Sequence, residues 1–178
     1  MNYKDIPQYT RSSPYAVDIG WGYLESWLES QDKHAQLELD PDFQRHHVWD
    51  DTKRSRYVEY ILRGGHSSMD IYFNCANYVG SKSLHDKEGP MQLVDGKQRL
   101  DAVRKWLRDD IPAFGLLKSC MQGSIRLTGP RFRVHVNDLQ TRAEVLQWYL
   151  DLNEGGVAHT EPELAKVRAM LAEETTPR

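Results

Sequence analysis

The stretch Leu93-Val94-Asp95-Gly96-Lys97-Gln98-Arg99-Leu100 decides how this chain is organised. Its apolar start is typical of a buried strand, and Asp-Gly is a strong turn signal. Apolar residues then recur at helical spacing, at Leu100, Val103, Trp106 and Leu107. We therefore predict a strand over 91–94, a tight turn at 95–96 and an amphipathic helix that follows directly.

A strand, a turn and a helix start in this order form a place where a protein can hold a phosphate. The first N–H groups of a helix have no partner within it, and the helix dipole adds partial positive charge there. Gly96 allows the backbone to approach a ligand closely, and Arg99 can add a forked, charge-assisted contact. Spacing alone also permits a plain structural reading, in which Asp95 caps the helix and pairs with Arg99 one turn later.

Composition narrows the class of protein. With 178 residues, 39% of them hydrophobic and 28% charged, the chain is long enough for one globular domain with a sizeable core. The net charge of -3 excludes a polyanion binder held by bulk charge, so any contact with nucleic acid has to be local. Cys75 and Cys120 lack zinc-site spacing, and no stretch is apolar enough to cross a bilayer. We expect a cytoplasmic protein without a membrane partner.

The order of the elements predicts a mixed fold. Residues 1–16 are expected to form an N-terminal arm and residues 17–174 a single domain. Apolar spacing predicts helices over 18–29 and from residue 51 or 52 to Gly64-Gly65, where a left-handed residue is typical. Alternation predicts short strands at Leu37 and Leu39, over 71–73 and over 132–136, and residues 77–89 are expected to be a loop. Residues 112–129 give no clear signal.

Two capping boxes indicate a helical C-terminal part. Thr141 with Glu144, and Thr160 with Glu163, each precede an apolar run of helical period. Between the two expected helices lies Asn153-Glu154-Gly155-Gly156, which spacing alone explains as a helix cap and turn.

Three ordered motifs carry a resemblance to a known family. They are Asp42-Phe43-Gln44-Arg45 followed by Trp49, then residues 94–100, then Leu152-Asn153-Glu154-Gly155-Gly156. Together they resemble the DGQQR-motif domain, which forms the N-terminal half of GmrSD-type, modification-dependent restriction enzymes. The resemblance spans about Leu37 to Leu171. It implies an α+β fold similar to ParB and sulfiredoxin, with a small mixed sheet, surrounding helices and a helical C-terminal part.

The resemblance implies nucleotide binding, with hydrolysis of a nucleoside triphosphate (NTP) in several relatives. It makes Asp95 and Arg99 the expected catalytic residues, with Asp95 either orienting Arg99 or binding a magnesium ion (Mg²⁺). The expected cofactor-binding residues are Gln44, Arg45, Gly96, Lys97, Gln98 and Asn153. Position 97 carries Lys where the family usually has Gln. Lys97 therefore either contacts phosphate or points into solvent.

The leading hypothesis is a nucleotide-binding, NTP-hydrolysing domain that acts in DNA restriction, anti-restriction or DNA-linked regulation. Its expected partners are an NTP and either DNA or a protein of a restriction system. The alternative is a non-catalytic DNA-binding or protein-interaction module, and a DNA nickase is a third reading. The relatives' C-terminal HNH nuclease domain has no room here, so we expect no autonomous cleavage. Pro41-Asp42 with Asp51-Thr52-Lys53 resembles a PD-(D/E)xK nuclease motif, but its second half falls at a helix start.

Overall fold

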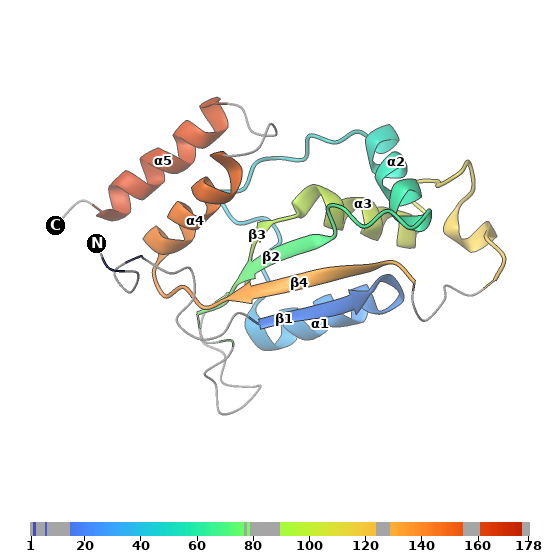
Figure 1. Ribbon diagram of the computed structural model, residues 1–178, viewed down its shortest axis with the longest axis horizontal. Helices are drawn as coiled ribbons and strands as arrows, with labels where there is room; N and C mark the ends of the chain where they lie inside the picture. The colour runs from blue at the N-terminus through green and yellow to red at the C-terminus, as the bar shows by residue number, and fades with distance from the viewer. Residues whose placement is uncertain are drawn as a thin grey trace.

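A four-stranded mixed sheet forms the centre of the protein (Figure 1). The computed structural model describes residues 2, 6, 15–76, 78, 90–123, 129–154 and 161–175. The strands are β1 (Tyr15–Gly20), β2 (Asp70–Asn74), β3 (Gln92–Asp95) and β4 (Arg131–Asn137), in the spatial order β1-β4-β2-β3. β4 runs antiparallel to β1 and parallel to β2, and β2 runs antiparallel to β3.

Helices surround this sheet, which confirms the predicted α+β class. They are α1 (Leu24–Ala35), α2 (Asp51–Leu62), α3 (Lys97–Leu107), α4 (Arg142–Glu154) and α5 (Glu161–Thr175). Two short 3-10 segments, η2 (Trp21–Tyr23) and η3 (Lys118–Cys120), complete the described elements. Figure 1 shows α4 and α5 together near one end of the sheet, with α2 and α3 towards the other. No described helix has the length and apolar character that a membrane crossing needs.

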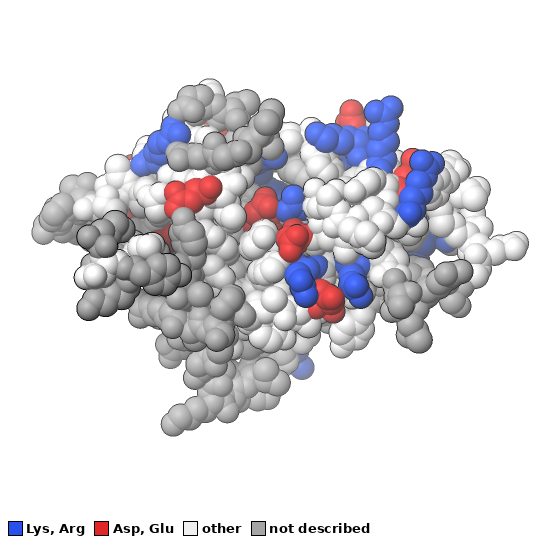
Figure 2. Space-filling model, in the orientation of Figure 1, with Lys and Arg blue, Asp and Glu red and all other residues white. Residues whose placement is uncertain are grey.

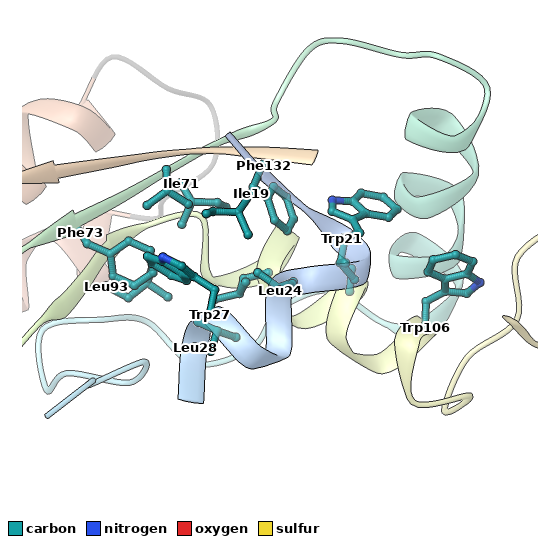
Figure 3. Close-up of a cluster of buried hydrophobic side chains, with 14 of the residues drawn as sticks. Ile19, Trp21, Leu24, Trp27, Leu28, Ile71, Phe73, Leu93, Trp106 and Phe132 are labelled. Atoms are coloured by element: carbon teal, nitrogen blue, oxygen red, sulfur yellow. The ribbon is translucent and has the colours of Figure 1, made fainter. Parts of the chain in front are cut away.

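The main core lies on one face of the sheet. Alternate strand residues such as Ile71, Phe73 and Phe132 are fully buried there, against Trp27 and Leu28 of α1 (Figure 3). The predicted alternation in β4 is confirmed, because Phe132, Val134 and Val136 all belong to this cluster. Burial of these side chains supplies the driving force that holds α1 against the sheet.

A second cluster lies on the opposite face and is built mainly by α4 and α5. Its members from outside these helices are Phe43, Val94 and Leu139. Leu93 belongs to the main core and Val94 to the second cluster, as expected for successive residues of a strand. The apolar run of β3 is thus explained by burial on both faces.

A bulge in β3 sets the direction of the residue that follows. Phe73 is paired with Leu93, whereas Tyr72 is paired with Asp95, so Val94 is the extra residue. In a regular strand without this bulge, side chains alternate between the two faces, so Asp95 would lie on the same face as Leu93 and point towards the main core. The bulge brings Asp95 to the face of Tyr72, in the way that bulges re-aim side chains beside functional sites.

The expected helix over 18–29 was wrong at both ends. Residues 18–20 belong to β1, where Asp18 pairs with Arg133 and Ile19 with Phe132, and α1 begins only at Leu24 and ends at Ala35. Long-range pairing overrides the local helical spacing here. The expected strand at 37–39 is reduced to a single bridge between Glu38 and Gln92.

Several local predictions are confirmed. α2 begins at Asp51 and ends before Gly64, and Asp50 caps it by accepting a hydrogen bond from the Lys53 amide at 2.7 Å. The first capping box forms with the reciprocal contacts of Thr141 and Glu144. Thr160 of the second box, Gly155-Gly156 and nearly all of the predicted loop over 77–89 lie outside the described residues.

Candidate functional site

A cavity of about 200 Å³ lies at the beginning of α3, between this helix, the 44–53 segment and α4. All eight residues predicted from the sequence line it. They are Gln44, Arg45, Asp95, Gly96, Lys97, Gln98, Arg99 and Asn153. The remaining lining residues are Trp49, Lys53 and Tyr149. Residues more than 100 positions apart in the chain therefore meet around one hollow.

Gly96 forms the turn from β3 into α3. Its φ of 104° lies in the left-handed region, and a Cβ built on it would lie 2.5 Å from Cδ1 of Ile71. No other residue fits this position without strain. No side chain caps the helix at Gly96, and the first turn carries no acidic residue. The positive end of α3 is thus open towards the cavity.

Arg99 is held by one end of its guanidinium. Its Nη2 donates to Oδ2 of Asp95 at 2.5 Å and to the main-chain oxygen of Asp70 at 3.0 Å. Its Nε is buried and has no hydrogen-bond partner. Nη1 donates to no residue in the part of the chain that the structure describes. The arginine is therefore fixed in place, while its Nε and Nη1 groups donate to none of the described residues.

Lys97 points neither into solvent nor into the middle of the cavity. It is 6% exposed, and its Nζ donates to Oδ1 of Asp40 at 2.5 Å and to the main-chain oxygen of Arg45 at 2.8 Å. Its charge is compensated by Asp40, and its ammonium group ties the 40–45 segment to the start of α3.

Two glutamines brace the same segment. The buried Gln44 donates through Nε2 to the main-chain oxygens of Leu93 and Val94, at 2.8 and 2.7 Å. Gln98 accepts through Oε1 from the amides of Val48 and Trp49, at 3.1 and 3.2 Å. These contacts join two parts of the chain that are about 50 residues apart. Arg45 lies in the chain between Gln44 and Val48, so these hydrogen bonds hold its main chain in position.

The wall formed by α4 adds a phenol and an amide. Burial raises the pKa of Tyr149 to about 12, although the charge of Arg45 and a hydrogen bond with its backbone act in the opposite direction. Asn153 donates through Nδ2 to the main-chain oxygen of Tyr149 at 2.6 Å. Both side chains are neutral hydrogen-bonding groups at neutral pH.

The outer rim is aromatic and cationic. Nζ of Lys53 lies 5.1 Å from the centroid of the half-buried Trp49 ring, and this ring packs on Tyr57 at 5.5 Å. Sequence reasoning missed Lys53 and Tyr149. Lys53 lies four residues after Trp49, and this spacing does not predict a contact unless the start of α2 between them is known. Tyr149 is indistinguishable in sequence from a core residue of α4.

The cavity carries four cationic side chains and one acidic side chain. Within the described ranges, no group of three His, Cys, Asp or Glu residues is arranged to hold a metal ion by itself. A larger cavity of about 500 Å³, between the end of α2 and the start of β4, is lined by none of the predicted residues. The arrangement at α3 is suited to an anion.

A comparison with protein families identifies the family of this chain. Residues 24–127 match the family model described as GmrSD restriction endonuclease, N-terminal domain. The chain belongs to this family. The match includes the Gln44-Arg45 and Asp95–Arg99 motifs and ends before Asn153. It connects the GmrSD N-terminal domain described here with restriction systems.

Searches of curated proteins and of solved structures found no significant match. The expected similarity to ParB and sulfiredoxin therefore stays a prediction, whereas the α+β class is confirmed by the strands and helices themselves.

Proposed function

We propose that this GmrSD N-terminal domain binds a nucleoside triphosphate at the start of α3 and hydrolyses it slowly as part of a restriction system. The observation that carries the proposal is the cavity at an uncapped helix N-terminus, lined by Arg45, Lys53 and Arg99. Helix amides and the dipole favour negative charge, and cationic side chains add to that preference.

The size of the cavity favours the phosphates as the inserted part of the ligand. Sites that enclose a whole small molecule span roughly 300–1,000 Å³, and this one measures about 200 Å³. The triphosphate would enter, and the nucleoside would extend along the rim beside Trp49 and Lys53. An aromatic ring with a nearby cation suits a planar base.

Arg99 supports the same assignment through its unused donors. Nη1 donates to no described residue and is not among the buried atoms that lack a partner, so it remains available to donate a charge-assisted hydrogen bond to an anion in the cavity. The contacts to Asp95 and Asp70 hold the guanidinium ready before a ligand arrives. Preorganised charge of this kind is the main contribution that proteins make to phosphoryl transfer.

Mg²⁺ fits the proposal as an ion shared between protein and ligand. Magnesium is commonly held by one or two carboxylates together with substrate phosphates, and Asp95 is the acidic residue of the cavity. Bound there, the ion would neutralise phosphate charge.

Calorimetric titration with ATP, GTP and CTP, each with and without magnesium, tests the binding step. We expect at least one nucleotide to bind, and we expect Arg99→Ala to weaken it tenfold or more, equal to about 1.4 kcal/mol. Arg108→Ala is the matched control, because Arg108 lies at the other end of α3 and pairs with Glu25. Equal affinities of the wild type and Arg99→Ala, with both proteins folded, would refute the proposal.

A further inference from the structure

A row of basic side chains follows the outer side of α2. Lys53, Arg56 and Arg63 are all exposed, and their spacing along the helix places them on one side of it. Figure 2, in the orientation of Figure 1, shows basic side chains standing out where α2 lies. This basic stripe of three residues is roughly 15 Å long, since each helical residue adds about 1.5 Å.

The protein does not neutralise the charges of the basic stripe. Within the described ranges, Lys53, Arg56 and Arg63 form no ion pair with a carboxylate. Nζ of Lys53 lies over the ring of Trp49, and the guanidinium of Arg63 lies 5.0 Å from the centroid of Phe114. Both contacts orient a cation and leave its charge in place.

The acidic side chains of α2 are engaged elsewhere. Asp51 pairs with Arg54 and Lys105, at 3.0 and 3.1 Å. Glu59 accepts a hydrogen bond from the main-chain amide of Phe114 at 2.7 Å. The basic stripe is therefore open to an anionic partner from outside the chain.

The larger cavity extends this positive surface beyond α2. Arg63, the last residue of the stripe, lines this cavity of about 500 Å³ together with His66 and Arg131. Arg131 and Arg133 share the single carboxylate of Asp18, at 3.4 and 3.3 Å, so this group of three side chains keeps a net positive charge. The positive surface thus reaches the start of β4.

The arrangement of the charges favours a duplex over other polyanions. Val58 and Ile61 of α2 are buried in the core, so this helix has no apolar side to insert into a membrane. Single strands are typically held by several stacking rings, whereas Tyr60 is the exposed aromatic residue of α2. A straight row of cations roughly 15 Å long suits a duplex, in which phosphates recur about every 3.4 Å along each strand.

We propose that the basic stripe and Arg131 bind the phosphate backbone of double-stranded DNA. This surface goes beyond the proposed nucleotide binding and does not depend on it. Phosphate contacts of this kind position a protein on a duplex without reading its sequence. The net charge of the chain is -3, so the attraction is local to this surface.

The test is fluorescence anisotropy of the full chain with a labelled DNA duplex, without nucleotide, between about 50 and 200 mM salt. Four phosphate contacts predict that the logarithm of the association constant falls with that of the salt concentration with a slope of about -3 to -4. Arg56→Ala and Arg63→Ala should each weaken binding about fivefold at the lowest salt and reduce the slope by about 1. Arg56→Lys and Arg63→Lys keep the charge and should retain most of the affinity.

Lys33→Ala is the matched control, because Lys33 is exposed on α1 and lies outside the basic stripe. Arg56 and Arg63 do not line the cavity at α3, so nucleotide affinity should be unchanged in their variants. Absence of duplex binding, or an unchanged affinity in the folded double variant, would overturn this inference and leave the proposed function standing. Equally tight binding of single-stranded DNA or of poly-glutamate would also overturn it.

Discussion

Gly96 and Ile71 are packed so closely that no side chain fits between them: a Cβ on Gly96 would lie 2.5 Å from Cδ1 and 3.3 Å from Cα of Ile71. The same glycine has a positive φ and begins α3. One residue therefore combines the backbone shape of the turn with the close approach of β2 to the candidate site.

Gly96→Ala should lower the free energy of unfolding by at least about 2 kcal/mol, since backbone strain and overpacking each cost roughly 1–3 kcal/mol. Urea denaturation followed by tryptophan fluorescence measures the change. Gly22→Ala is the control, because nothing lies within 4 Å of a Cβ at that position and its φ is not in the left-handed region. Equal stability of the two variants would show that the turn tolerates a side chain.

Gln44→Glu should destabilise the fold at neutral pH by roughly 2–4 kcal/mol, because a carboxylate would face the oxygens of Leu93 and Val94 without a proton to donate. Protonation restores a donor, so the folded state raises the pKa of the new carboxyl group. The loss of folding stability in Gln44→Glu should therefore shrink as the pH falls, and it should grow as the pH rises through the folded-state pKa of the new carboxyl group. Gln44→Leu lacks a titrating group and should show no such pH dependence in parallel urea titrations.

Lys97→Met should lower the free energy of unfolding by about 1–3 kcal/mol, since the main-chain oxygen of Arg45 loses a charge-assisted donor in a buried setting. Lys105→Met on the same helix is the comparison, because the ion pair of Lys105 with Asp51 is solvent-exposed and should matter much less. Thermal and urea unfolding of both variants would show which substitution lowers the free energy of unfolding more. A larger effect at position 105 would contradict the structural role assigned to Lys97.

Glu25 should contribute stability that acid removes. Burial alone would raise its pKa, but hydrogen bonds and charge from Arg104 and Arg108 outweigh this and lower the pKa below its usual 4.5. A lowered pKa in the folded state stabilises above pH 4.5, and the contribution disappears as the pH falls through the folded-state value. Wild type should exceed Glu25→Gln in stability at pH 7, and the difference should vanish once the pH lies below the folded-state pKa of Glu25. A difference independent of pH would mean that the ion pairs are not its origin.

Local chemistry made much of this fold predictable from sequence. The Asp-Gly turn, the start of α2 and the Thr141–Glu144 box each depend on contacts within a few residues, and all three were predicted. The alternation in β4 was equally clear, because its apolar residues lie on one buried face. β1 was missed because its identity depends on pairing with β4, more than 100 residues later.

In the candidate site, too, some features could be predicted from the sequence and others depend on long-range contacts. Motif residues were predicted to meet, and they line one cavity. The partners that orient them were not predictable, because Asp40 of Lys97 and Asp70 of Arg99 lie 57 and 29 residues away without a recognisable spacing. The bulge that turns Asp95 towards Tyr72 likewise arises from strand register, which sequence periodicity does not report.

The central claim is that phosphate oxygens bind at the N-terminus of α3. The most direct measurement is a titration of ¹⁵N-labelled protein with magnesium and a non-hydrolysable NTP, followed by backbone amide chemical shifts. The account predicts the largest shifts at Gly96, Lys97 and Gln98, together with the Nε signal of Arg99. Unchanged signals at these positions, or shifts confined to the larger cavity around Gly64-Gly65 and Pro130, would contradict it.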